Sequence, residues 1–203
     1  MDISNKTIER ICRVFGVLNA LGKSNIEFIS SRDLAETTGT TDYSLRKDIS
    51  SLGVTGYTRK GYNVGSLKEA LGNKLALNKR RKACIVGLGR LGTALLDYEK
   101  FQEDGFEIVA GFDNSVNKLE RIKTHIEVFA DIYIREIIDK KGIELGIIAV
   151  PAEHAQDVAD DLIDAGVKGI LNFAPVKIII PANIMYQDMD FTNALRMIAA
   201  RLD

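Results

Sequence analysis

The sequence contains no tryptophan, only two histidines and only two cysteines among 203 residues. So few histidines leave little for histidine-based catalysis. Cys12 and Cys84 lie far apart without CxxC spacing, which argues against a disulfide framework or a zinc site and fits a reducing cytoplasm. No run of about 18 apolar residues occurs, and the N-terminus lacks a signal peptide's apolar stretch. We therefore expect neither a membrane span nor secretion.

The composition is otherwise that of a folded protein, with 46% hydrophobic and 27% charged residues. The length allows one large domain or two small ones. The net charge of -1 conceals an asymmetry: residues 1–82 hold 15 Lys and Arg against 8 Asp and Glu, and the remainder holds 12 against 20. A basic first half (+7) and an acidic second half (-8) predict two domains with different partners, the first being a polyanion.

The basic half has the pattern of a small helical domain. Apolar residues recur at helical spacing over residues 5–21. Two shorter helices are predicted within residues 30–39 and 42–53, the first starting at a capping serine and both ending at a glycine. Two short helices joined by a tight turn containing glycine are typical of a helix-turn-helix, here within about residues 15–54.

A basic hairpin, the wing of a winged helix, is predicted for residues 58–64, followed by a helix at 66–77. The second helix of the motif would enter a major groove while the wing contacts flanking phosphates. A small helical domain whose charges face solvent is the alternative. The residues predicted to contact DNA are Ser31, Tyr43, Ser44, Arg46, Lys47, Arg59 and Lys60.

The acidic half opens with a dinucleotide-binding pattern. An apolar strand at residues 83–86, the sequence GLGRLG and a helix at 93–101 follow one another directly. Gly87 permits the tight turn, Gly89 lets the backbone approach a pyrophosphate, and Gly92 lets the helix pack on the strand. The free N–H groups at the start of the helix favour the phosphates.

A second strand at residues 106–112 supports this interpretation. It ends in Asp113, 21 residues after Gly92, where a carboxylate is expected to bind the adenosine ribose. The same charge would repel a 2′-phosphate, which favours NAD(H) over NADP(H). An ordinary glycine-rich turn followed by a solvent-exposed aspartate is the alternative.

Further strands and helices alternate to the end of the chain. Strands at residues 145–150 and 169–173, separated by a helix at 152–165, predict a parallel doubly wound sheet. Pro151 and Pro175 follow strands at the carboxyl edge, where such sheets bind ligands.

Residues 178–180 are a candidate for another strand, and a C-terminal amphipathic helix is capped by Asp190 or Thr192. The expected fold class is α/β, a winged helix-turn-helix domain followed by a Rossmann-like parallel-sheet domain and a C-terminal helix. The expected boundaries are 1–80 for DNA binding, 81–185 for NAD(H) binding and 186–203 for the dimerisation helix.

An enzymatic role has little support. His154 near a strand end is a candidate acid or base, assisted by Glu153 or Asp157, but the favoured interpretation is a surface residue in the first turn of a helix. Neither cysteine has a neighbouring base, which argues against thiol chemistry. Too little chain remains after the sheet for a substrate domain, so we expect no catalysis.

Segments along the whole chain resemble those of the redox-sensing transcriptional repressor Rex family. The most specific are the Arg-Lys-Asp of residues 46–48 and the sequence GILNFAP of residues 169–175. The other matching segments are residues 30–35, 45–50, 61–64, 87–92, 97–98, 150–151, 155–156 and 190–191.

The resemblance implies a homodimer that binds an inverted-repeat operator through its winged helices and senses NADH against NAD⁺ in its Rossmann domains. In this family the C-terminal helix is exchanged between subunits, NADH releases the DNA, and NAD⁺ leaves the protein competent to bind it. By position, Tyr98, Pro151 and Phe191 would border the nicotinamide, with Asp190 beside it. The resulting cofactor-binding residues are Gly87, Leu88, Gly89, Arg90, Leu91, Gly92, Tyr98, Asp113, Asn114, Val150, Pro151, Asp190 and Phe191.

The chain departs from the family's pattern at three places. In the wing, Thr58 and Arg59 replace an arginine and a glycine; the first helix carries Gly16; and the usual proline after Asp113 is missing. These departures keep two alternatives open. One is a DNA-binding regulator of the same fold with a degenerate or altered nucleotide site, and the other is an NAD-dependent oxidoreductase.

Overall fold

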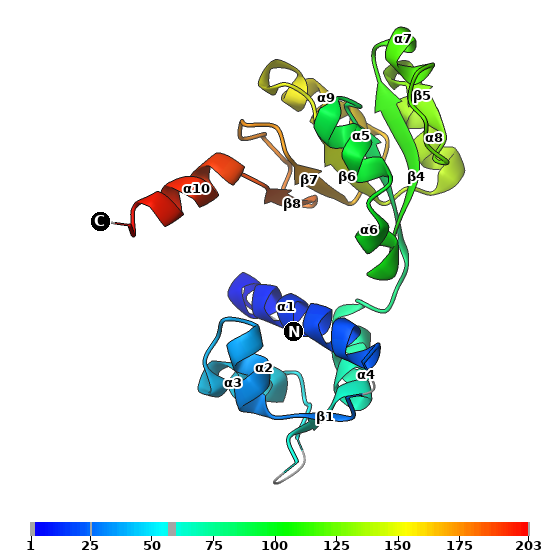
Figure 1. Ribbon diagram of the computed structural model, residues 1–203. Coiled ribbons are helices and arrows are strands. Elements are labelled where there is room, and N and C mark those ends of the chain that lie inside the picture. Colours follow the sequence, from blue (N-terminus) through cyan, green and yellow to red (C-terminus); the bar gives the residue numbers. More distant parts are fainter. Residues whose placement is uncertain (1–2, 25, 57–59, 203) are drawn as a thin grey trace. The chain divides into compact units, whose positions relative to one another are not determined.

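The computed structural model describes residues 3–24, 26–56 and 60–202. The chain forms two compact units, Met1–Lys79 and Arg80–Asp203, each with its own core (Figure 1). Within the described residues, no helix has both the length and the apolar character needed to cross a membrane.

The first unit is a helical domain with a small sheet. Polar side chains that accept backbone N–H groups begin its helices, as Ser30 and Thr41 do for the two helices of the helix-turn-helix. The buried faces of the helices meet in one apolar core that includes Leu18, Leu45 and Leu71. The helices are α1 (Asn5–Gly22), α2 (Ser31–Thr37), α3 (Asp42–Ser51) and α4 (Val64–Leu75). The strands are β1 (Phe28–Ile29) and β2 (Tyr62–Asn63).

The wing region differs in detail from the expectation. Thr58 and Arg59 lie outside the described residues, and β2 pairs antiparallel with β1. Gly61 makes this pairing possible, because its φ is +81° and a Cβ there would lie 2.2 Å from the carbonyl oxygen of Ile29. The following helix begins at Val64, two residues earlier than predicted, since the Asn63 side chain caps it.

The second unit is a six-stranded parallel sheet with the order β5-β4-β3-β6-β7-β8. Counted from β3, this is the order 3-2-1-4-5-6 of dinucleotide-binding folds, in which the order reverses between β3 and β6. The strands are β3 (Arg81–Val86), β4 (Phe106–Asp113), β5 (Val128–Ala130), β6 (Leu145–Ile148), β7 (Gly169–Asn172) and β8 (Met185–Asp188).

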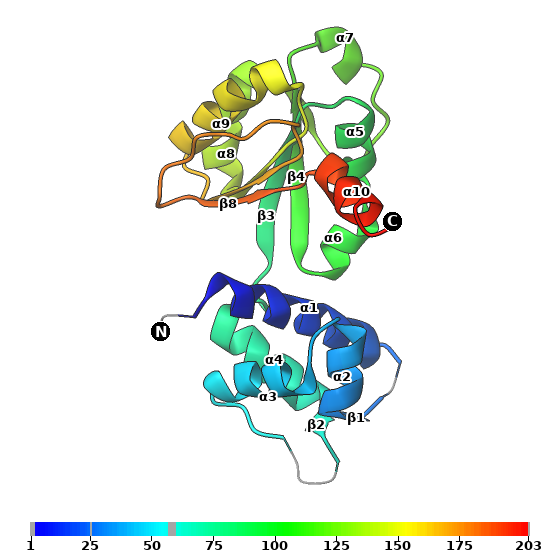
Figure 2. The same ribbon diagram turned by 90° about the vertical axis from the view of Figure 1, so that its left-hand side faces the viewer.

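Helices cover the two faces of this sheet (Figure 2). On one face α8 and α9 pack against side chains such as Phe112 and Ile148, and on the other α5 and α6 pack against Ile85 and Ile108. The helices of this unit are α5 (Arg90–Leu96), α6 (Glu99–Glu103), α7 (Val116–Leu119), α8 (Ile134–Lys141), α9 (Ala155–Asp164) and α10 (Phe191–Ala199).

The predicted helix at 93–101 is interrupted. It divides into α5 and α6 because Tyr98 is extended (φ -76°, ψ 94°). Next to it the Asp97 carboxylate accepts a hydrogen bond from the Thr124 hydroxyl, 2.8 Å away, in a segment distant in the sequence.

The predicted strand at 178–180 is wrong. The Gln156 side chain bonds both the N–H and the carbonyl oxygen of Ile179, and the Tyr186 hydroxyl accepts the N–H of Ile178. Side chains therefore satisfy backbone groups that a strand would pair with a neighbouring strand. The sixth strand lies later, at Met185–Asp188, beside β7.

Candidate functional site

The turn after β3 places three glycines in three different environments. Gly87 has a φ of +95°, and a Cβ there would lie 2.7 Å from the carbonyl oxygen of Ala149. A Cβ on Gly92 would lie 1.9 Å from the carbonyl oxygen of Gly87, so α5 packs directly on the turn. A Cβ on Gly89 would meet nothing within 4 Å. The turn thus needs Gly87 and Gly92 for its own geometry, and Gly89 leaves space above the backbone.

Asp113 at the end of β4 joins this turn to the next segment. The side chain is buried, 4% exposed, and its Oδ2 accepts the Leu88 N–H at 2.9 Å. Its Oδ1 accepts the Ser115 N–H at 2.9 Å, and the Lys118 ammonium lies within 3.2 Å of both oxygens. The carboxylate is therefore held in place beside the glycine turn, where an adenosine ribose would be bound.

A cavity of about 650 Å³ opens at the carboxyl edge of the sheet, next to the glycine turn. Its position at the reversal of strand order is where α/β sheets bind their ligands. Most of the predicted nucleotide-binding residues line it. These are Gly87, Gly89, Arg90, Leu91, Asp113, Asn114, Val150 and Pro151.

One part of the cavity wall is acidic. Asp131, Asp157 and Asp161 line it, and His154 of the same wall is exposed. Burial raises the pKa of Asp161, and the charges of Asp131 and Asp157 raise it further. A phosphate is disfavoured at that wall, so the phosphates of a nucleotide fit best on the glycine side. The open space over Gly89 satisfies the steric requirement of a pyrophosphate.

Four of the other predicted residues are not in the wall of this cavity. The Leu88 side chain is buried in the core, and Gly92 packs on the turn. Asp190 caps α10 by accepting the Asn193 N–H at 2.8 Å. The Phe191 ring contacts the Phe173 ring at a tilt of 36°, with ring centroids 5.8 Å apart, and Phe173 lines the cavity.

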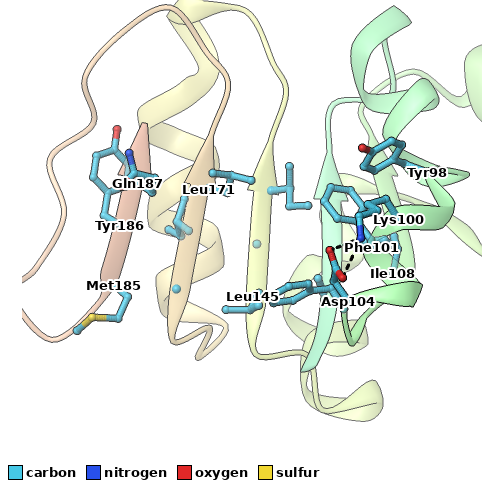
Figure 3. A pocket seen from close by; sticks show the side chains of 16 residues that line it. Tyr98, Lys100, Phe101, Asp104, Ile108, Leu145, Leu171, Met185, Tyr186 and Gln187 are labelled. Carbon is cyan, nitrogen blue, oxygen red and sulfur yellow. Dashed lines mark hydrogen bonds and ion pairs between the residues drawn. The ribbon is translucent and has the colours of Figure 1, made fainter. Parts of the chain in front are cut away.

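Tyr98 lies elsewhere in the second unit. It lines a second, apolar cavity of about 460 Å³ on the sheet face (Figure 3). Three neighbouring strands form the floor, with Leu145 of β6, Leu171 of β7 and Met185 of β8, and Phe101 of α6 lies on the other side. The structure does not bring Tyr98 into the wall of the nucleotide cavity.

Several lining residues were not predicted from the sequence, among them Phe173 and Lys118. Phe173 directly follows β7 in the GILNF segment, which was a usable signal for a position at the carboxyl edge. Lys118 gives no such signal, because only the folded turn after β4 brings it back onto Asp113.

In the first unit, α3 presents a polar face. The Tyr43 side chain is 77% exposed, and Lys47 is exposed. Arg46 is held by its neighbours: its Nε donates to the Ser31 hydroxyl at 2.9 Å and to Asp42 at 3.1 Å. A recognition helix contacts base edges with side chains from its first turns, and these residues lie there.

The other predicted DNA-binding residues have different surroundings. Ser31 is buried and positions Arg46, and the Ser44 N–H bonds the capping Thr41 hydroxyl. Lys60 is exposed, with its ammonium 5.3 Å from the centre of the Phe28 ring. Arg59 lies outside the described residues.

Comparison with known proteins gives a match for each of the two units. Residues 2–50 match the family model described as putative DNA-binding protein N-terminus, and residues 78–176 match the one described as CoA binding domain. The redox-sensing transcriptional repressor Rex of Carboxydothermus hydrogenoformans is 39% identical over 97% of this chain and 94% of its own length. Redox-sensing transcriptional repressor Rex 1 of Thermotoga maritima is 36% identical over 94% of this chain and 91% of its own length.

Solved structures give the same result. RSP, a Rex-family repressor, in complex with β-NAD⁺ and operator DNA has a TM-score of 0.88 and 32% identity, with all of this chain and 93% of that chain covered. RSP in complex with β-NADH gives a TM-score of 0.86 at the same identity, with all of this chain and 95% of that chain covered. This chain, with a DNA-binding unit and a dinucleotide-binding fold in one polypeptide, therefore belongs to the redox-sensing transcriptional repressor Rex family.

Proposed function

We propose that this protein is a transcriptional repressor that binds operator DNA in its apo or NAD⁺-bound form and is released by NADH. The observation that carries the proposal is that one chain holds an exposed recognition helix in one unit and, in the other, a glycine turn with open space over Gly89. We assign residues 1–80 to DNA binding, 81–185 to NAD(H) and 186–203 to dimerisation. The protein would act in the cytoplasm, as a sensor without catalysis.

On the DNA side, α3 enters the major groove. Tyr43, Arg46 and Lys47 are the candidates for contacts with base edges and phosphates. Ser31 fixes the direction of the Arg46 guanidinium. An arginine held in this way contributes more to DNA affinity than a freely rotating one, because it loses less rotamer entropy on binding. The net charge of +7 on residues 1–82 makes binding strongly dependent on salt.

On the nucleotide side, the pyrophosphate lies over Gly89 and the ribose beside Asp113. These groups are identical in NADH and NAD⁺, so the nicotinamide ring must account for any difference in their effects. The Phe173–Phe191 pair lies at the boundary between the cavity and α10. A positively charged ring loses solvation on approaching such an apolar surface, whereas the neutral ring of NADH does not.

The proposed homodimer uses α10. No described residue of this helix is buried, and Leu195, Met197 and Ile198 are each more than half exposed. In Figure 1 the helix extends beyond β8, away from the sheet. Burying each of these side chains on a second subunit would contribute about 1.5–3 kcal/mol. A two-fold dimer places two recognition helices on an inverted repeat.

The test is binding to an AT-rich inverted-repeat DNA, titrated separately with NADH and with NAD⁺. Release by NADH but not by NAD⁺ supports both sites and their coupling, with an expected change in DNA affinity of about 5- to 150-fold. Arg46→Ala should weaken DNA binding and leave NADH affinity unchanged. A DNA affinity that changes with neither dinucleotide would favour the alternative, a regulator of the same fold whose nucleotide site is altered.

A further inference from the structure

Lys118 occupies the acceptors that a ribose would need. Its ammonium lies 3.2 Å from Oδ1 and 3.1 Å from Oδ2 of Asp113. The backbone N–H groups of Leu88 and Ser115 use the same two oxygens. A carboxylate offers about four lone-pair positions, so these donors saturate it. A ribose diol that donates to Asp113 must therefore displace one of them.

The lysine is the donor that can leave. Leu88 and Ser115 donate from backbone that is fixed by the glycine turn and by the start of α7. The Lys118 side chain is 53% exposed and lies on the four-residue helix α7, whereas the Asp113 side chain is 4% exposed. The ammonium can move into solvent with no loss of core packing, and the carboxylate cannot.

A displaced ammonium stays close to the ribose. Lys118, Asp113 and Asn114 line the same cavity, and the lysine side chain has four rotatable carbons between its backbone and its charge. The 2′-position of a bound adenosine ribose would face Asp113. A 2′-phosphate there would be repelled by the carboxylate and attracted by Lys118.

We propose that Lys118 sets the specificity of the adenosine side of the site. It competes with the ribose hydroxyls for Asp113, and after displacement it pairs with a 2′-phosphate. This inference rests on the proposed function, in which the cavity binds a nicotinamide dinucleotide. The lysine thus weakens the binding of NADH and offsets the repulsion between Asp113 and NADPH. Both effects lower the ratio of the NADPH to the NADH dissociation constant, which measures the preference for NADH.

The experiment measures NADH and NADPH affinity for the full chain and for Lys118→Met, which keeps the apolar stem and removes the charge. The ratio of the NADPH to the NADH dissociation constant should rise by about tenfold, the effect of losing one charge-assisted hydrogen bond. Lys123→Met, at an exposed lysine of the same segment, is the matched control and should leave the ratio unchanged.

Two outcomes separate this inference from the proposed function. A parent chain that binds NADH normally, with an unchanged ratio in Lys118→Met, would overturn the role of Lys118 alone. A parent chain that binds neither dinucleotide would overturn the proposed function as well.

A second variant tests whether the effect is competition. In an Asp113→Asn background that melts at the parent temperature, Lys118→Met should no longer tighten NADH binding, because no carboxylate remains to compete for. If Lys118→Met tightens NADH binding equally in both backgrounds, Lys118 acts through its charge alone and not through Asp113. That result would overturn the proposed competition for the carboxylate. The ratio of the NADPH to the NADH dissociation constant in Lys118→Met alone tests the role of the lysine even if Asp113→Asn does not fold.

Discussion

Arg10 of α1 and Asp48 of α3 form a bidentate ion pair that joins two helices of the DNA-binding unit. The Arg10 Nη2 lies 2.9 Å from Oδ1 of Asp48 and its Nε lies 2.5 Å from Oδ2, while Thr7 donates a third bond. The Asp48 side chain is only 7% exposed. The last residue of the Arg-Lys-Asp segment therefore faces the protein and fixes the helix that carries Arg46 and Lys47.

The first prediction concerns this pair. Arg10→Ala leaves a buried carboxylate without its cation and should lower the free energy of unfolding of the first unit by about 3 kcal/mol. Urea denaturation followed by circular dichroism measures it. Arg13→Ala is the control, because Arg13 pairs with Glu9 on the exposed surface of the same helix and should cost about 0.5 kcal/mol or less. Equal losses in the two variants would contradict the structural role of the pair.

The second prediction separates two glycines of one turn. Gly89→Ala adds a Cβ in open space, so the fold should lose about 1 kcal/mol or less at this helix cap. The same Cβ would meet a pyrophosphate, and NADH affinity should fall by about tenfold or more. Gly92→Ala should instead destabilise the second unit by about 1–3 kcal/mol, because its Cβ would lie 1.9 Å from the Gly87 carbonyl oxygen.

Thermal melting and NADH titration of both variants check this prediction. Normal NADH affinity in a folded Gly89→Ala variant would show that no pyrophosphate lies over this glycine.

The third prediction concerns redox selectivity. Phe191 packs against Phe173 beside the cavity, and both rings are apolar surface against which a charged nicotinamide would lose solvation. Phe191→Ala should therefore bring the NADH and NAD⁺ affinities closer together by about tenfold. Titration of each dinucleotide into the parent and the variant gives the ratio, and an unchanged ratio would refute the role of Phe191.

The fourth prediction concerns how the free energy of unfolding depends on pH, through Glu144 at the amino edge of the sheet, opposite the edge that bears the cavity. Hydrogen bonds from Lys168 (2.7 Å) and Arg81 (3.0 Å) lower the pKa of Glu144 from its ordinary 4.5. Because the folded pKa is the lower one, the ion pairs contribute stability above pH 4.5 and lose it as the pH falls through the lowered pKa.

Glu144→Gln should therefore lower the free energy of unfolding by about 1 kcal/mol at pH 7, and the difference from the parent should shrink on acidification. Urea denaturation at a series of pH values measures this. Glu136→Gln, at an exposed position of α8, is the matched control. A difference that persists unchanged in acid would contradict the assignment.

Local signals in the sequence located most elements of the fold. Ser30 and Thr41 start the helices that their side chains cap, and the glycine motif after β3 has the spacing that its geometry requires. The parallel sheet followed from the alternation of apolar segments, although β5 and α8 were not predicted.

Contacts between distant residues explain what the sequence could not predict. Asp97 ends α5 beside Thr124, and Gln156 holds Ile179 out of the sheet, although neither pair is near in the chain. The last strand was missed because Met185–Asp188 alternates exposed and half-buried residues instead of forming an apolar run.

The saturated carboxylate at the end of β4 also restricts how this site can change over evolutionary time. Replacing Asp113 would remove partners from the glycine turn and from the segment after β4 in one step, so a mutation there affects folding and recognition together. Lys118 and Asn114 line the same cavity from more tolerant positions. Lineages of this repressor that adopt a different nucleotide are therefore expected to keep the aspartate and to vary the residues around it.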